Sequence, residues 1–334
     1  LTVTEEIFFT CYLMNTPHQL SVRVIENDTD FRELLNGIFE RSELFDLVGS
    51  HESVEEFGAE MLANKPFEAW FPQLMVVDVM SSTDPGLEGA SFMSALRAEG
   101  LSRGDTASVF MENRVEFLAL LIALNKLGVI AGLINTNLRG RPLSHCVTVT
   151  ASRKCIFGAE LAPALAEVRA ELALDPERDY LGVADGALAA PEWSRDLNAL
   201  LVSDDPGNPV ETADNLLGGH AFYIFTSGTT GLPKAAVLSN RRYLSSALLA
   251  HKAALKCSQK DRIYVCLPLY HGTGLIVGFG STLFSGSSMF VRRKFSASNF
   301  LNEVRQYEAS CFVYIGELCR YLMSQPRRDD DADN

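Results

Sequence analysis

The sequence has little positive charge and no cysteine spacing typical of a metal or redox site. Its 334 residues hold 29 Lys and Arg against 42 Asp and Glu, which gives a formal net charge of −13. Affinity for nucleic acid comes mainly from Lys and Arg that neutralise phosphates, so we exclude a protein that coats nucleic acid. The seven cysteines form no C-x-x-C pair and several lie in apolar runs. We therefore expect reduced core cysteines of a cytoplasmic protein, and no metal site.

The sequence also lacks a signal peptide and a clear membrane span. Glu5 and Glu6 lie where a secretory signal would be basic. The first residue is Leu1 rather than Met, so we expect a chain that is incomplete at its front or begins at a processing or gene-model artefact. Residues 272–291 carry no charge but contain five Gly and four Ser. A buried helix, a turn near Gly286 and a strand are favoured over a membrane span.

From residue 91 onward, helical and strand patterns alternate along the chain. Helices are expected at residues 91–99, 115–127, 142–150, 162–172, 243–256, 299–307 and 317–324. Strands are expected at residues 107–110, 129–134, 154–157, 221–225, 235–238, 263–267, 289–291 and 311–314. This alternation predicts an α/β fold with mostly parallel sheets covered by helices.

Two regions do not follow the alternation. Residues 175–219 are rich in Pro and acidic residues, and we expect a surface connection there. Residues 1–90 contain helical fragments at 31–39 and 54–62 but no regular pattern, so they form an unassigned N-terminal region. Residues 91–334 are then the main domain.

The clearest functional motif is residues 226–234 (TSGTTGLPK), which lie between two apolar strands. Glycines let the backbone approach an anion closely, hydroxyl groups donate hydrogen bonds, and Lys234 adds a mobile positive charge. A flexible surface linker is the alternative, but a linker would not be flanked by strands and closed by Pro and Lys. The predicted phosphate-binding residues are Thr226, Ser227, Gly228, Thr229, Thr230, Gly231 and Lys234.

Other nucleotide and hydrolase motifs are absent. Lys234 is followed by Ala235 and not by the Ser or Thr of a Walker loop. The chain contains no complete G-x-G-x-x-G after a strand, no G-x-S-x-G and no H-E-x-x-H. The commonest dinucleotide-binding, hydrolase and metalloprotease functions are therefore excluded.

The phosphate motif resembles that of the adenylate-forming superfamily, and residues 267–271 (LPLYH) are similar to the next motif of that superfamily. Residues 134–140 (INTNLRG), 293–298 (RKFSAS) and 314–322 (YIGELCRYL) are similar to its fatty acid transport protein and very-long-chain acyl-CoA synthetase branch. Asn240 stands where many relatives carry His, and we expect it to cap the following helix. The later superfamily motifs, including those of the C-terminal lobe, are not in the sequence. The resemblance therefore implies that residues 91–334 are an incomplete AMP-binding N-terminal lobe of an adenylate-forming enzyme, with the C-terminal lobe missing.

The resemblance implies an ATP-dependent ligase that joins a long or very long fatty acid to coenzyme A. The acid first attacks the α-phosphorus of ATP-Mg²⁺ to form an acyl adenylate and pyrophosphate, and the coenzyme A thiol then displaces AMP. It implies that the phosphate loop and Lys234 hold the β- and γ-phosphates, and that His271 borders the acyl carboxylate. Tyr270, Gly316 and Glu317 are implied pocket residues.

Several alternatives remain open at this stage. His271 could be a structural histidine, and Glu317 could form an i to i+3 ion pair with Arg320 on an exposed helix face. Residues 243–256 and 275–284 could line an acyl tunnel or serve as ordinary core. The protein could act in fatty acid uptake through peripheral membrane attachment, could act on another carboxylic acid, or could be an inactive nucleotide-binding fragment.

Overall fold

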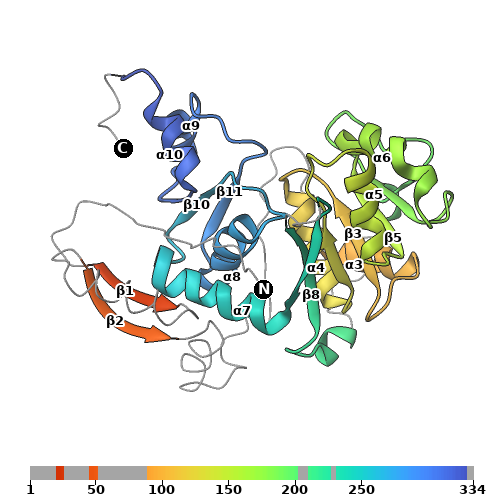
Figure 1. Cartoon of the computed structure of the whole chain (residues 1–334), viewed down its shortest axis with the longest axis horizontal. Helices are drawn as coiled ribbons and strands as arrows, with labels where there is room; N and C mark the ends of the chain where they lie inside the picture. The colour runs from red at the N-terminus through yellow and green to blue at the C-terminus, as the bar shows by residue number, and fades with distance from the viewer. Residues whose placement is uncertain (1–19, 26–44, 52–88, 202–209, 227–230, 329–334) are drawn as a thin grey trace.

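The computed structural model describes residues 20–25, 45–51, 89–201, 210–226 and 231–328 (Figure 1). The strands are β1 (Leu20–Ile25), β2 (Phe45–His51), β3 (Thr106–Phe110), β4 (Ile130–Leu133), β5 (Lys154–Gly158), β6 (Tyr180–Val183), β7 (Arg195–Asp196), β8 (His220–Thr226), β9 (Lys234–Ser239), β10 (Arg262–Val265), β11 (Ser288–Val291) and β12 (Cys311–Val313).

The helices in the described part of the chain are α3 (Gly89–Ala98), α4 (Val115–Lys126), α5 (Gly140–Val149), α6 (Ala162–Val168), α7 (Asn240–Leu249), α8 (Ser281–Ser285), α9 (Phe300–Gln306) and α10 (Gly316–Met323). Two further segments are π-helical, namely η6 (Ala250–Leu255) and η7 (Thr273–Gly280). Short 3-10 turns lie at Ala159–Leu161, Arg169–Glu171, Asn198–Leu200 and Val210–Asp214.

The largest sheet has seven strands in the order β7-β6-β5-β3-β4-β8-β9. All neighbouring pairs in it are parallel except β8 and β9, which form an antiparallel hairpin. A second sheet has the order β11-β10-β12 and is parallel throughout. β1 and β2 pair in parallel as a third sheet, and the sequence analysis predicts no strand at either position.

Helices cover both faces of the large sheet because its side chains alternate in direction and both faces are apolar. Val109 and Ile156 pack in a core that includes residues of α3 and α4. Phe110 and Phe157, the next residues along the same strands, pack with residues of α5 and α6. Figure 1 shows α5 and α6 together beside β5. The α/β fold class predicted from the sequence is confirmed.

The small sheet is built around Tyr264 of β10, whose side chain is fully buried. Its ring centroid lies 5.2 Å from those of Phe290 and Phe300 and 5.8 Å from that of Phe312. The Tyr264 hydroxyl donates a hydrogen bond of 2.6 Å to Oε2 of Glu303. Residues of this sheet belong to the same apolar core as α3 and α4, so the two parallel sheets share one core.

The uncharged run 272–291 forms η7, α8 and β11, as the helix, turn and strand interpretation predicts. Gly286, at φ 67°, ends α8 in the left-handed conformation that favours glycine. Among the described residues, no helix combines the length and apolar character needed to cross a bilayer. The described cysteines, Cys146, Cys155, Cys257, Cys266, Cys311 and Cys319, are all free.

Two local predictions are wrong. The expected surface connection at 175–219 contains β6, which is fully buried and pairs with β5, and the short edge strand β7. Asn240 does not cap α7, because the Ser239 hydroxyl accepts the capping hydrogen bond from the backbone N–H of Arg242. The Asn240 side chain instead donates to Leu216 O and accepts from Asn125. The helical fragments expected at 31–39 and 54–62 lie outside the described residues.

Candidate functional site

Loops that follow parallel strands of the two sheets meet in one region. Glu112 follows β3 of the large sheet, and its Oε1 lies 2.8 Å from Nζ of Lys294, which follows β11 of the small sheet. Asn113 donates a 2.8 Å hydrogen bond to the carbonyl oxygen of Leu267, which follows β10. Ligands of open α/β sheets bind outside the carboxyl ends of the strands, so this region is the candidate site.

The described ends of the phosphate motif, Thr226 and residues 231–234, lie at the carboxyl end of β8 and the start of β9. Thr226 and Lys234 are cross-strand partners, and both are exposed. Gly231 has φ +85° with open space where a Cβ would lie, which is the glycine-favouring conformation expected of such a loop. Nε2 of His145 lies 3.0 Å from the carbonyl oxygen of Pro233, so α5 supports the return of the loop.

Four predicted phosphate ligands are not described by the structure: Ser227, Gly228, Thr229 and Thr230. The described ends of the loop nevertheless place it between two strands, as the sequence predicts. Residues 226 and 234 form the last pair of the antiparallel ladder. The loop that they close follows the carboxyl end of β8, on the same edge of the sheet as Glu112 and Asn113.

The second motif, residues 267–271, lies directly after β10. Leu267, Leu269 and Tyr270 are buried, whereas His271 is partly exposed. The ring centroids of Tyr270 and His271 are 4.8 Å apart. Burial raises the pKa of the Tyr270 hydroxyl, and its hydrogen bond with Thr136, from the loop after β4, opposes that shift. The motif is therefore linked to the carboxyl edge of the large sheet.

A network of charged groups lies at the carboxyl ends of β3, β6 and β11. The Arg114 side chain is only 6% exposed and lies 3.1 Å from Oδ1 of Asp185. It also donates hydrogen bonds to the carbonyl oxygens of Val183 and Ala184. Arg293 forms a bidentate ion pair with Asp185, in which Nη2 donates a 2.6 Å hydrogen bond to Oδ1. These hydrogen bonds hold the pKa of the Asp185 carboxyl below its usual range and raise the pKa of Arg293.

The sequence analysis did not single out Asn113, Arg114 or Asp185. The signal that could have found them is positional, because each lies two to four residues after a buried strand of a parallel sheet. Polar side chains at that position face the edge where such sheets bind ligands.

The predicted pocket residues Gly316 and Glu317 lie at the start of α10 and are both exposed. Glu317 and Arg320 form the i to i+3 ion pair that the alternative interpretation expected. That pair holds the pKa of the Glu317 carboxyl below its usual range. A pocket role for Gly316 and Glu317 therefore stays a prediction.

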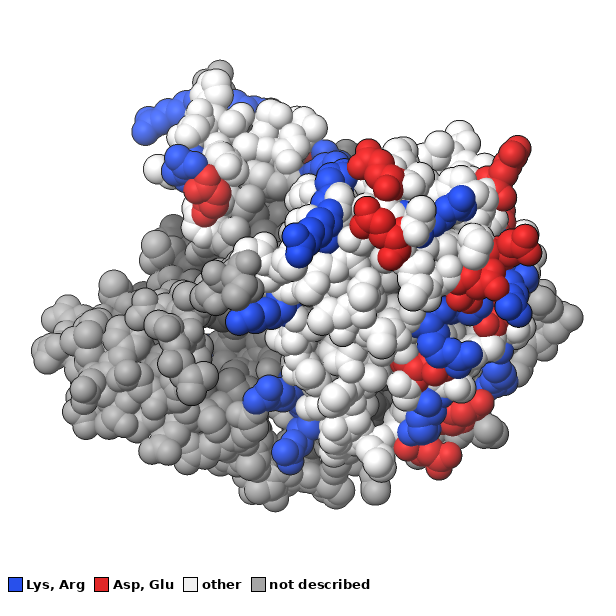
Figure 2. Space-filling view, turned by 45° about the vertical axis from the view of Figure 1, so that its right-hand side comes forward, with Lys and Arg blue, Asp and Glu red and all other residues white. Residues whose placement is uncertain are grey.

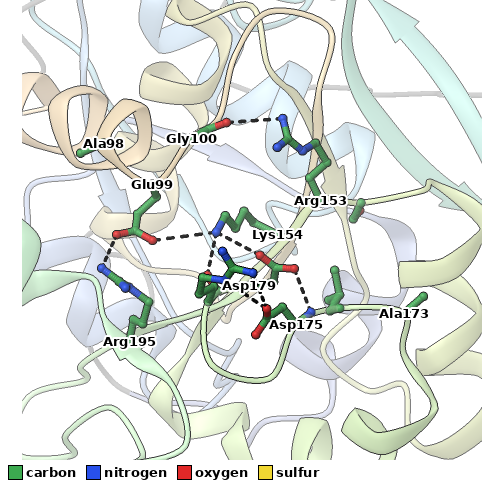
Figure 3. Close-up of a pocket in the computed structure, with 12 residues that line it drawn as sticks. Ala98, Glu99, Gly100, Arg153, Lys154, Ala173, Asp175, Asp179 and Arg195 are labelled. Atoms are coloured by element: carbon green, nitrogen blue, oxygen red, sulfur yellow. Dashed lines mark hydrogen bonds and ion pairs between the residues drawn. The ribbon is translucent and has the colours of Figure 1, made fainter.

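A separate hollow of about 610 Å³ lies at the opposite, amino ends of β5, β6 and β7 (Figure 3). Lys154 is buried there and lies 3.0 Å from Oδ1 of Asp179, while Nη2 of Arg195 lies 2.6 Å from Oε1 of Glu99. Figure 3 shows these charged groups turned toward one another rather than toward open space. The charged groups that line the hollow are thus largely paired with one another, and we do not assign a functional site to it.

Charged side chains and possible metal ligands can be described for part of the molecule. On the face shown in Figure 2, acidic and basic side chains are interspersed on the right-hand part of the molecule and do not form a patch of one sign. Within the described ranges, no group of three His, Cys, Asp or Glu residues could hold a metal ion.

Comparisons with known proteins identify the family. The family model described as AMP-binding enzyme matches residues 90–334. The chain is 40% identical over 233 residues to long-chain fatty acid transport protein 1 of Rattus norvegicus, covering 69% of this chain and 35% of that protein. It is 33% identical over 241 residues to the medium/long-chain-fatty-acid–CoA ligase FadD6 of Mycobacterium tuberculosis, covering 72% and 38%. The chain thus spans little more than a third of the length of these relatives.

Solved structures agree on the fold. The N-terminal domain of FACL13 from Mycobacterium tuberculosis matches with a TM-score of 0.58 and 22% identity, over 71% of this chain and 56% of that one. The anthranilate CoA ligase AuaEII, solved with anthranoyl-AMP, matches with a TM-score of 0.60 and 21% identity, over 67% and 42%. From its sequence, its fold and the family match over residues 90–334, the chain belongs to the AMP-binding enzyme family, among relatives named fatty acid transport proteins and fatty acid–CoA ligases.

Proposed function

We propose that the complete protein is an ATP-dependent ligase that joins long-chain or very-long-chain fatty acids to coenzyme A. The observation that carries this proposal is the position of two motifs. The phosphate motif, in the β8–β9 hairpin (called the phosphate hairpin below), begins at the last residue of β8 in the large sheet. Residues 267–271 follow β10 of the small sheet. The loops that carry both motifs lie at the carboxyl ends of parallel strands, where a nucleotide and an acyl carboxylate could meet.

In this proposal, Lys234 and the loop 226–231 hold the β- and γ-phosphates of ATP-Mg²⁺. Lys234 is exposed at the start of β9, so no part of the fold has to open before its ammonium group can contact a phosphate. His271 borders the acyl carboxylate, and Tyr270 shapes that side of the site. The reaction needs alignment and charge neutralisation more than a protein nucleophile.

The reaction balances in two steps. A carboxylate oxygen of the fatty acid attacks the α-phosphorus, and the bond to the β-phosphate oxygen breaks to release pyrophosphate. The coenzyme A thiolate then attacks the acyl carbon, and the carbon–oxygen bond breaks to release AMP. In this scheme Lys234 neutralises part of the negative charge on the pyrophosphate leaving group.

Preference for long acyl chains is supported by the names of the relatives and by the motifs at residues 134–140, 293–298 and 314–322. The relatives named transport proteins support a role in fatty acid uptake, in which ligation to coenzyme A traps the imported acid. Attachment to a membrane would then be peripheral in the described part of the chain. Fractionation of cells that express the complete protein would test this part separately, because a protein found only in the cytosol contradicts it.

The test of the proposal is an assay of the complete protein with ATP, Mg²⁺, coenzyme A and palmitate. We expect palmitoyl-CoA and AMP in equal amounts, and none when ATP is omitted. Acetate and an amino acid serve as competing substrates in the same assay. A protein that forms acetyl-CoA faster than palmitoyl-CoA would contradict the proposed substrate class.

A further inference from the structure

The side chain of Asn113 joins the two sheets at the candidate site. It is 5% exposed, and its Oδ1 accepts a 2.8 Å hydrogen bond from the backbone N–H of Leu269. Its Nδ2 donates to the carbonyl oxygen of Leu267 at 2.8 Å and to that of Arg292 at 3.2 Å. The amide therefore contacts the segments after β10 and β11 while its own backbone follows β3.

The two bonds to Leu267 and Leu269 follow the pattern of a parallel ladder. In such a ladder, one residue bonds the carbonyl of residue i and the N–H of residue i+2 on the neighbouring strand. The Asn113 amide offers the same donor and acceptor pair, so it acts as one added ladder residue beyond the end of β10. Pro268, between the two bonded residues, has no N–H to lose.

Gly274 restrains the same segment. A Cβ on Gly274 would lie 2.3 Å from the carbonyl oxygen of Pro268 and 2.7 Å from that of Leu267. The backbone of η7 therefore approaches this segment as closely as only glycine permits. The segment also sets the next residues, since the His271 N–H donates to the Pro268 carbonyl oxygen at 3.1 Å. Residues 267–269 are thus restrained both by the Asn113 amide and by the η7 backbone.

We propose that Asn113 is a positioning residue for adenylate formation, which fixes His271 and its neighbours relative to the phosphate hairpin. The proposal rests on the proposed function, since it assigns the segment after β10 to the acyl carboxylate. Asn113 lies in the loop after β3, a strand of the sheet that carries the hairpin, whereas Leu267 and Leu269 belong to the segment that carries His271. Loss of the amide removes three hydrogen bonds that set the distance between these two parts.

The experiment compares the complete wild-type protein with Asn113→Ala, Asn113→Asp and the control Asn125→Ala. Asn125 is also a hydrogen-bonded, partly buried asparagine, but its amide donates to Asn240 near the far end of α4. Palmitate-dependent ATP–pyrophosphate exchange gives the adenylation rate, circular dichroism gives the folded fraction, and calorimetry gives ATP affinity. Rates are compared per folded molecule, so that a loss of stability alone does not count.

We expect Asn113→Ala to lower the exchange rate per folded molecule by about 10- to 100-fold, because misplacement by about 1 Å can cost that much. ATP affinity should stay unchanged, since the amide contacts no part of the phosphate hairpin in the described residues. Asn125→Ala should retain the wild-type rate. Equal rates for the Asn113→Ala and Asn125→Ala proteins would overturn the positioning role.

Asn113→Asp supplies a second measurement, the pH dependence of the exchange rate per folded molecule. A purely structural role of Asn113 would leave that dependence unchanged. Its carboxylate would face the carbonyl oxygens of Leu267 and Arg292, and this repulsion together with burial raises the pKa of the carboxyl. Once protonated, the carboxyl is again a donor and an acceptor. The rate of this variant relative to wild type, per folded molecule, should therefore rise as pH falls from about 8.5 to about 6.

The outcomes separate the two proposals. If the rate of Asn113→Asp relative to wild type does not change with pH, the positioning role is overturned. This test holds even if Asn113→Ala fails to fold. A wild-type protein without palmitate-dependent exchange contradicts the proposed function itself. An active wild type with an unaffected Asn113→Ala contradicts only the role of Asn113.

Discussion

Substitution of Gly274 by Ala tests how tightly η7 packs on the segment after β10. The added Cβ would lie 2.3 Å from the carbonyl oxygen of Pro268. Its position is fixed by the η7 backbone and the carbonyl oxygen belongs to the backbone, so no side-chain rotation can relieve the contact. Real contacts of this kind are about 3.4 Å, so η7 must shift by about 1 Å, and overpacking of this kind costs about 1–3 kcal/mol. We expect a value near the upper end of that range, because the Cβ has no freedom to rotate away and the atoms it meets are backbone.

Gly272→Ala is the matched control, since Gly272 lies two residues earlier in the same segment. A Cβ there would meet only Cδ1 of Ile276 at 3.6 Å, an ordinary contact, and Gly272 has helical φ −54° and ψ −40°. Replacement of Gly by Ala in helical backbone stabilises by up to about 1 kcal/mol. The two substitutions therefore add the same methyl group with opposite expected effects.

The assay is thermal unfolding of the complete protein, followed by circular dichroism. A change of about 1 kcal/mol moves Tm by about 2–4 °C for domains of about 150–250 residues. We therefore expect Gly274→Ala to lower Tm by about 6–12 °C and Gly272→Ala to leave it equal or slightly higher. Equal Tm values for the two variants would refute the packing described for η7.

The remaining predictions concern catalysis, substrate, length and pH. Lys234→Ala in the complete protein should abolish most acyl-CoA formation without a change in Tm, and wild-type turnover would contradict the phosphate role. In a panel of acids from acetate to C16 and longer, the long acids should give the highest kcat/KM, and a preference for acetate would contradict this. Residues 1–334 expressed alone, which span about a third of the relatives' length, should fold in part but form no palmitoyl-CoA, and measurable product would show that the catalytic parts lie within them. The pKa of the Asp185 carboxyl is depressed in the folded state, so its ion pair should stabilise the fold above the unfolded-state pKa of about 3.9 and lose that effect as the pH falls below it. The Tm difference between wild type and Asp185→Asn should therefore shrink below about pH 4. A difference that stays constant would contradict the ion pair.

The elements around the phosphate motif could be predicted because each has a strong local pattern. β8 and β9 are apolar strands on either side of a Ser, Thr and Gly loop, and both lie within a residue of the expected bounds. The helix expected at 115–127 is α4, an apolar helix stopped by a glycine at φ +71°. These features depend on residues close in sequence, so the chain alone specifies them.

Other features depend on contacts between distant residues. β6 is only four residues long and contains Gly182, so its strand character comes from pairing with β5 and not from its own pattern. The predicted helix 243–256 changes to the π-helical η6 after Leu249. η6 packs beside η7, another π-helical segment, and the apolar pattern of residues 243–256 does not distinguish an α-helix from a π-helix.

The candidate site shows the same division. The sequence predicts the phosphate loop and residues 267–271 from their residue types and spacing. It does not predict that Asn113 ties the segment after β3 to Leu267 and Leu269, because Asn113 and Leu267 are 154 positions apart and meet only when both sheets have formed. A polar residue shortly after a buried strand is a weak signal by itself. Only the structure shows that Asn113 bonds to Leu267 and Leu269.

The most direct test of the central claim follows the oxygen atoms of the fatty acid. The complete protein is supplied with palmitate labelled with ¹⁸O in the carboxyl group, together with ATP, Mg²⁺ and coenzyme A, and the products are analysed by mass spectrometry. If the carboxylate attacks the α-phosphorus and coenzyme A then displaces AMP, one labelled oxygen remains on AMP. We predict labelled AMP and unlabelled pyrophosphate. Label in inorganic phosphate together with ADP, or unlabelled AMP, would contradict an acyl adenylate and with it the proposed function.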